Sequence, residues 1–154
     1  MPRTGFHPVG QYGYATQMLL ATLEAIVENG HVNGQAIGER ILSLWRDSLL
    51  LRREASTAEA IEQVARGRRD WTDAGLEPGR AEAAPVVRAV AVGLWDHADL
   101  AALSTDVSAT TAVTHRDPRP ASCAAAVAAA VAGNLHVSEL CLGPFLDRVA
   151  GAAG

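Results

Sequence analysis

Two tyrosines near the amino terminus carry side chains that can do acid–base chemistry. Tyr12 and Tyr14 stand two residues apart, in a segment that also contains Gly10 and Gly13. A phenol can donate a hydrogen bond to a substrate carbonyl, and it can act as an acid or a base when its surroundings shift its pKa. Both tyrosines are therefore candidate catalytic residues.

A second candidate site lies in the segment from Thr114 to Pro120, which contains His115 and Asp117. A histidine can act as a general base near neutral pH, and a neighbouring carboxylate can orient its ring. The alternative interpretation is structural, because a histidine in such a loop also braces the chain or caps a helix. Both interpretations stay open at this point.

Arg88 is the third residue of interest. It is flanked by Val87 and Val90, which predicts that it lies on a buried face. A buried guanidinium needs a partner, and the candidates are Glu24, Glu82 or a carboxylate of a ligand. Arg88 is thus either half of a structural ion pair or a ligand-binding residue.

Other common site patterns are absent from the sequence. There is no H-E-x-x-H or C-x-x-C pair, no phosphate-cradling glycine motif and no serine-nucleophile motif. The sequence therefore predicts neither a metal ion nor a cofactor.

Composition limits the class of partner and the location of the protein. The net charge is −4 and no basic block occurs, so nucleic acid is not expected as a partner. The apolar run from Ala124 to Ala132 is about half of what a membrane span needs. Two cysteines are too few for a disulfide scaffold, and Cys123, in an alanine-rich run, is predicted to be small and buried. We expect a soluble, cytoplasmic protein without a membrane partner.

Apolar residues recur at helical spacing along most of the chain, and no segment alternates long enough to form a strand. The sequence predicts one all-α domain over residues 1–154, a compact helical bundle with an arm at 1–13 and a frayed tail at 151–154. Asp96, with Asp99 three residues later, is expected to begin the fifth helix in the manner of a capping box. The expected helices, seven in number, cover about 16–29, 34–51, 56–67, 85–95, 96–107, 121–132 and 138–149.

The segment from Gly10 to Met18 resembles a motif of the ADP-ribosylglycohydrolase family, G-x-Y-T-D-D-T-Q-M. Tyr12, Thr16 and Gln17 are among the matching positions. Residues 13–15, Gly-Tyr-Ala, stand where the family has T-D-D.

Two further segments resemble the same family, in the same order along the chain. Residues 80–94 are similar to G-x-G-N-G-x-x-M-R-x-A-P-x-G-L: Arg88 and Gly93 match, whereas Glu82 begins the three residues that replace G-N-G. Residues 108–132 resemble a helix, a T-H-P-x-P turn and an alanine-rich helix, with Thr114 and His115 at the turn. The resemblance covers roughly residues 9–133.

This resemblance implies a helical fold and a hydrolytic site in which aspartates hold two magnesium ions. Magnesium prefers oxygen ligands, chiefly carboxylates. At the matching positions Tyr14 is a neutral phenol and Ala15 offers no ligand, and nothing after Gly133 resembles the family's G-G-D-x-D-[TS] segment. Metal-assisted hydrolysis is therefore not expected. Tyr14 either takes part in a replacement function or fills the volume of the metals.

We expect the former cleft to bind a small molecule or a peptide, in a biosynthetic pathway, with metal-independent cyclisation, addition or isomerisation as the chemistry. Tyr12, Tyr14, His115 and Asp117 are the catalytic candidates. The ligand-binding candidates are Thr16, Gln17, Glu82 and Arg88. The alternative is a non-catalytic binding or regulatory module. A third and weaker hypothesis is residual glycohydrolase activity with aspartates from a partner chain.

The resemblance also implies a bundle about twice as long as this chain. Apolar faces that pack in the longer fold would then be exposed, for example around Leu49–Leu51 or along Val127 and Val131. Exposed apolar patches on soluble proteins commonly become interfaces. We therefore expect a two-fold homodimer.

Overall fold

A computed structural model describes residues 10–51, 54–76, 79 and 81–153. Within these residues the chain is helical and has no strand, and its only β-type pairing is an isolated bridge between Leu76 and His115. The predicted all-α bundle is confirmed. The helices are α1 (Tyr14–Asn29), α2 (Gly34–Arg46), α3 (Ala55–Ala65), α4 (Ala84–Trp95), the 3-10 turn η1 (Asp96–Ala98), α5 (Leu100–Ala112), α6 (Pro118–Asn134) and α7 (Leu142–Ala153).

Local signals explain most helix ends. Asn33 caps α2 by accepting a hydrogen bond from the Ala36 amide at 3.1 Å, and Asp99 accepts two amide hydrogen bonds at the start of α5. The predicted helix start at Asp96 was wrong, because Asp96 begins the 3-10 turn η1 and the cap of α5 is Asp99. Such caps satisfy amides that have no partner within the helix. Gly30, with φ of 71°, ends α1 in the left-handed conformation that glycine adopts without strain.

Several boundaries differ from the prediction. Helix α2 ends at Arg46 because Ser48 has a φ of 56°, which a helix cannot contain. Helix α6 begins at Pro118, three residues early, since proline is well suited to the first turn. Helix α7 continues through Ala153, into the segment where a frayed tail was expected. The prediction that Cys123 is buried was wrong, because it lies on an exposed face of α6.

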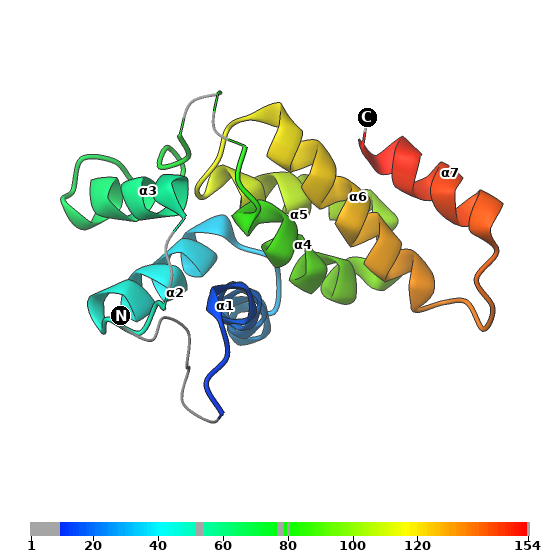
Figure 1. Cartoon of the computed structure of the whole chain (residues 1–154), viewed down its shortest axis with the longest axis horizontal. Coiled ribbons are helices and arrows are strands. Elements are labelled where there is room, and N and C mark those ends of the chain that lie inside the picture. Colours follow the sequence, from blue (N-terminus) through cyan, green and yellow to red (C-terminus); the bar gives the residue numbers. More distant parts are fainter. Residues whose placement is uncertain (1–9, 52–53, 77–78, 80, 154) are drawn as a thin grey trace, which may run out of the picture.

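The helices form a row that can be followed in Figure 1. Helix α1 is seen end-on near the centre, α2 and α3 lie on one side of it, and α4, α5 and α6 lie on the other, with α7 at the far edge. Helices α4 and α6 approach closely at Gly93, where an added Cβ atom would lie 2.5 Å from the Ala128 carbonyl oxygen. The glycine in the family-like segment therefore serves packing.

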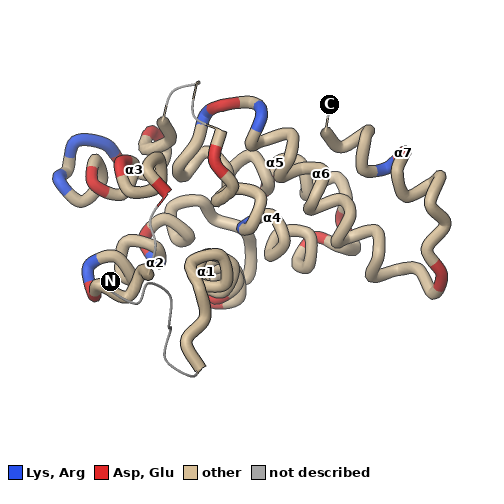
Figure 2. Tube along the Cα trace, in the orientation of Figure 1, with Lys and Arg blue, Asp and Glu red and all other residues tan. Residues whose placement is uncertain are grey.

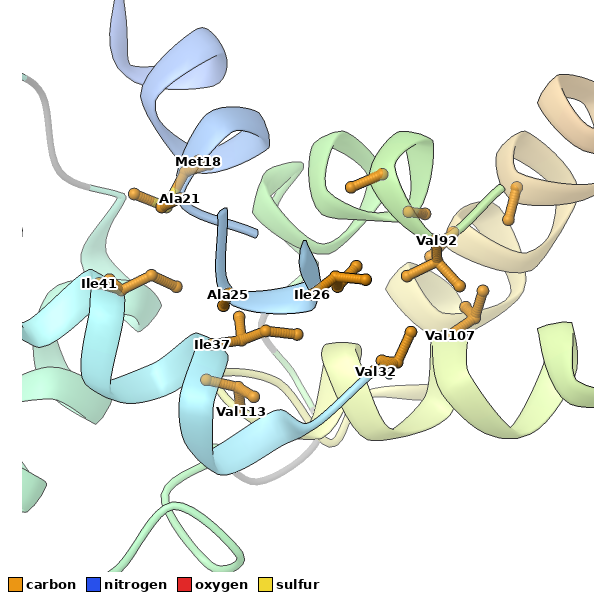
Figure 3. Packing of buried hydrophobic residues seen from close by; sticks show 14 of the residues in the cluster. Met18, Ala21, Ala25, Ile26, Val32, Ile37, Ile41, Val92, Val107 and Val113 are labelled. Atoms are coloured by element: carbon orange, nitrogen blue, oxygen red, sulfur yellow. The ribbon is translucent and has the colours of Figure 1, made fainter. Parts of the chain in front are cut away.

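The apolar core runs along this row (Figure 3). Ile26 of α1, Ile37 of α2 and Val92 of α4 are fully buried within it, and Val107 of α5 lies beside Val92 in the same cluster. Burying one such side chain contributes about 1.5–3 kcal/mol to folding. This core holds together the helices whose ends carry the polar side chains of the candidate site.

Charged residues are sparse along the helices of the core and frequent around α3 and in the loops, as Figure 2 shows. Among the described residues, no helix combines the length and the apolar character that crossing a membrane requires.

Candidate functional site

The amino-terminal ends of α3 and α4 face each other and exchange caps. The Glu54 carboxylate, just before α3, accepts a hydrogen bond from the Ala84 amide of α4 at 2.9 Å. The Glu82 carboxylate, just before α4, accepts one from the Ser56 amide of α3 at 3.0 Å. Each helix thus supplies the acceptor that the other lacks. Together with Tyr14, Arg88 and His115, these two glutamates form what we call the polar cluster.

Tyr14 is the first residue of α1, and its phenol lies near Arg88, Glu54 and Glu82 of the cluster. Its hydroxyl is buried and has no hydrogen-bond partner within the described residues by distance and angle. Burial raises the pKa of the phenol, and the neighbouring Thr57 hydroxyl and Arg88 charge lower it less. Tyr14 is therefore a neutral phenol beside the Thr57 hydroxyl, and its O–H makes no well-aligned hydrogen bond among the described residues.

Arg88 is completely buried on α4. Its Nη2 donates to the Thr114 hydroxyl at 2.6 Å and to the Thr110 carbonyl at 3.2 Å, while Nε and Nη1 have no hydrogen-bond partner among the described residues. Burial lowers the pKa of the guanidinium to about 10, against the attraction of Tyr14 and Glu54, so that it stays charged near neutral pH. Neither carboxylate suggested from the sequence pairs directly with it.

His115 is 98% buried, at the loop that leads into α6. Its Nδ1 is hydrogen-bonded to the Thr114 hydroxyl at 2.8 Å, and its Nε2 lies 3.8 Å from a Glu82 oxygen without a hydrogen bond. Burial and the Arg88 charge lower the pKa of the imidazole to about 4, although Glu82 and Asp117 oppose this. His115 is therefore neutral at physiological pH.

Asp117 lies near His115 but does not bond to its ring. Its carboxylate accepts hydrogen bonds from the Arg119 guanidinium at 2.7 and 2.9 Å, from the Arg119 amide and from the Gly79 amide at 2.7 Å. Those bonds, chiefly from the Arg119 side chain, hold the pKa of Asp117 well below its usual range. The carboxylate caps α6, and the group that orients the imidazole is Thr114.

The remaining sequence candidates lie apart from the polar cluster. Tyr12 is 51% exposed and lines a groove of about 300 Å³ together with Gln17 and Leu49. Gln17 braces the following loop, because its amide donates to the Leu49 carbonyl at 2.7 Å and accepts from the Leu51 amide at 3.1 Å. Thr16 is exposed on α1. The structure therefore brings together Tyr14, Glu82, Arg88 and His115, and separates Tyr12, Thr16 and Gln17 from them.

Sequence reasoning missed Glu54 and Thr57. Thr57 falls within the predicted 56–67 helix and Glu54 lies just before it, and no local motif distinguishes either residue. They belong to the site because the amino-terminal ends of α3 and α4 are in contact, and no local sequence pattern predicts that contact. A second groove, of about 580 Å³, lies between α2 and residues 69–72 and contains none of the candidates.

Glu54, Glu82 and His115 also form the one cluster of possible metal ligands within the described part of the chain. One ligand atom from each lies within 4.8 Å of the others. Burial, and then the nearby Glu82 charge, raise the pKa of Glu54, against the Ala84 amide and Arg88, which lower it.

The comparison with known sequences gives the family. The family model of ADP-ribosylglycohydrolases matches residues 1–150. The chain belongs to the ADP-ribosylglycohydrolase family. No curated protein matches it. The resemblance first seen in three short segments is thus confirmed over almost the whole chain.

The polar cluster does not fit the magnesium pair that membership in the ADP-ribosylglycohydrolase family implies. Only two carboxylates are present, and the third possible ligand is an imidazole nitrogen, which magnesium disfavours. The two negative charges are already balanced by the Arg88 guanidinium and by two helix amino termini, each equivalent to about half a positive charge. Two further dications would meet a site that is close to neutral.

Proposed function

We propose that this member of the ADP-ribosylglycohydrolase family has lost magnesium-dependent hydrolysis and binds a small molecule or a peptide at the polar cluster. The observation that carries the proposal is the charge balance around Glu54 and Glu82. Their carboxylates are held by amides and balanced by Arg88, beside the buried Tyr14 hydroxyl. Unpaired buried polar groups are costly, and a polar ligand can supply their partners.

The reaction that fits these groups is a metal-independent proton transfer that leads to isomerisation, addition or cyclisation. Glu54, with its raised pKa, takes a proton from the ligand, and the Tyr14 hydroxyl donates a hydrogen bond to the oxygen on which charge develops. Glu54 thus acts as the base and Tyr14 as the hydrogen-bond donor, the two roles that acid–base catalysis needs. Such a reaction would suit a cytoplasmic biosynthetic pathway.

A second candidate function is a non-catalytic binding or regulatory module. The observation in its favour is that Nε and Nη1 of Arg88 and Nε2 of His115 have almost no solvent-exposed area. A ligand must therefore displace a neighbouring side chain to reach them. The partly exposed Glu82 side chain, 25% accessible, is the point at which a ligand would enter.

We also propose a two-fold homodimer. The faces expected to be exposed are not fully so, because Leu50 is buried and Val127 and Val131 are half-buried. Support comes instead from the exposed apolar residues at the carboxyl-terminal end, where α7 buries none of its residues fully. These are Leu135, Val137, Leu140, Leu142 and Leu146. Light scattering at micromolar concentration should give about twice the chain mass of 16.1 kDa. A mass of a single chain would rule the dimer out.

Thermal unfolding tests the function, because a ligand that binds only the folded state raises the melting temperature. Millimolar magnesium with ADP-ribose should leave the melting temperature unchanged. Small neutral carbonyl compounds, screened one by one, should include ligands that raise it in the wild type and not in Tyr14→Phe. A rise of several degrees that requires both magnesium and ADP-ribose would contradict the proposal and call for a glycohydrolase assay.

A further inference from the structure

Thr114 lies between the two least exposed members of the polar cluster. Its hydroxyl oxygen is 2.6 Å from Arg88 Nη2 and 2.8 Å from His115 Nδ1, and the residue is fully buried. Arg88, Thr114 and His115 therefore form a hydrogen-bonded chain, anchored at the other side of Nη2 by the Thr110 carbonyl.

The direction of this chain follows from counting protons. A guanidinium has donors and no acceptor, so Arg88 donates to the Thr114 oxygen. Thr114 then has one proton of its own to place. If it donates to His115 Nδ1, both hydrogen bonds of the Thr114 oxygen have one donor and one acceptor. If Nδ1 carried the proton instead, the Thr114 oxygen would accept both hydrogen bonds, and its own buried proton would have no acceptor in either of them, which is unfavourable.

We infer that Arg88 and Thr114 hold His115 as the tautomer with its proton on Nε2, and that His115 recognises an acceptor oxygen of the ligand. The second half of this inference rests on the proposed function. Thr114 is a positioning residue in this arrangement, because it acts through the imidazole. His115 is a hydrogen-bond donor, whereas the sequence suggested a general base.

The surroundings of Nε2 define the ligand group further. Nε2 has no hydrogen-bond partner within the described part of the chain, and the nearest Glu82 oxygen, at 3.8 Å, is beyond hydrogen-bond distance and already accepts from the Ser56 amide. Because Arg88 and the two helix termini already balance Glu54 and Glu82, an anionic ligand would add an uncompensated negative charge to the cluster. The group that fits is a neutral carbonyl oxygen of an amide, ester or ketone, with its neighbouring N–H or acidic C–H facing a carboxylate.

The free protein tests the tautomer, because the two nitrogens of a histidine ring have distinct nitrogen NMR shifts when protonated and unprotonated. In protein labelled at histidine nitrogen, at pH 7, the His115 signals should show a protonated Nε2 and an unprotonated, hydrogen-bonded Nδ1. A protonated Nδ1, or a fully protonated ring, would overturn the inference. This result does not depend on any ligand and leaves the proposed function standing in either case.

Two variants test whether Thr114 is responsible. Thr114→Val removes the hydroxyl at nearly constant volume, and the His115 Nδ1 shift should move to that of a nitrogen without a hydrogen-bond donor. Thr114→Ser should restore the wild-type shift. An unchanged Nδ1 signal in folded Thr114→Val would show that Thr114 does not position the ring. If the valine variant does not fold, the wild-type spectrum and Thr114→Ser still decide the tautomer.

Three simple probes test the acceptor chemistry. N-methylacetamide at tens of millimolar should shift the His115 Nε2–H signal, because it offers a neutral carbonyl oxygen that reaches Nε2 when the partly exposed Glu82 side chain moves aside. Methylammonium, which only donates, and Zn²⁺, which needs an unprotonated Nε2, should leave the signal unchanged. A response to methylammonium or Zn²⁺ with none to the amide would overturn the assignment of an acceptor ligand.

Discussion

Glu54 and Glu82 cap each other's helices. The Glu54 carboxylate binds the first amide of α4 and the Glu82 carboxylate binds an amide in the first turn of α3, across 30 and 26 residues of sequence. Neither helix has a side-chain cap from its own N-cap residue. The pair therefore joins two helix ends and at the same time brings two carboxylates beside Arg88, Tyr14 and His115.

Removing one of these caps should lower stability modestly. Glu54→Ala leaves the Ala84 amide without its acceptor, and the loss of a helix cap costs about 1 kcal/mol, or roughly 3 °C in melting temperature. Glu54→Gln keeps an acceptor oxygen and should lose less than half as much. The exposed Glu139→Ala is the control. Equal losses in the alanine and glutamine variants would show that charge, and not the hydrogen bond, stabilises this junction.

Gly93 should not tolerate a side chain. In Gly93→Ala the new Cβ would lie 2.5 Å from the Ala128 carbonyl oxygen and 3.0 Å from Val131 Cβ, so α4 and α6 must separate. We expect a loss of about 1–3 kcal/mol in urea unfolding, although alanine is the better helix former. Gly143→Ala in α7, where no atom lies within 4 Å, is the matched control. If both substitutions stabilise the protein, α4 and α6 do not approach as closely at Gly93 as the structure shows.

His115 should make the folded state sensitive to acid. Its pKa is about 4 when folded and 6.5 for the unperturbed group, so the unfolded state binds the proton first. Its contribution is complete above pH 6.5 and is lost as the pH falls towards 4, by at most about 3 kcal/mol. The stability advantage of wild type over His115→Asn should therefore shrink between pH 7 and pH 4.5. A constant difference over this range would contradict the burial of a neutral imidazole.

Asp96 should have the opposite pH dependence. Burial and then the neighbouring Asp106 carboxylate raise the pKa of Asp96 from 3.8 to about 6. The ionised form is thus unfavourable in the folded state above pH 6, and this penalty disappears as the pH falls below about 4. Asp96→Asn should raise the free energy of unfolding at pH 7.5 by as much as about 3 kcal/mol and have little effect near pH 4. The exposed Asp147→Asn should change neither value, and a gain that is independent of pH would point to packing instead.

The helices and their order could be predicted from the sequence, because the signals that specify them are local. The apolar spacing of residues 16–29 predicted α1 to within two residues, and the helix expected at 85–95 is α4. The start of α6 was predicted three residues too late, because proline breaks a helix interior but also occurs in the first turn of a helix, as Pro118 and Pro120 do here. The replacement of T-D-D by residues 13–15 could likewise be recognised from the sequence without a structure.

The partners of the polar side chains were decided by tertiary structure alone. Glu54 belongs to the site only because the amino-terminal ends of α3 and α4 are in contact. Asp117 does not belong to it, because its carboxylate accepts hydrogen bonds from Arg119 and Gly79. Arg88, for which a carboxylate partner was expected, instead donates to Thr114 and thereby sets the ring of His115. Helix periodicity is a property of neighbouring residues, so the sequence by itself determined the bundle and the loss of the aspartates. Hydrogen bonds between segments 26 to 38 residues apart depend on how the helices pack, and only the folded structure determined them.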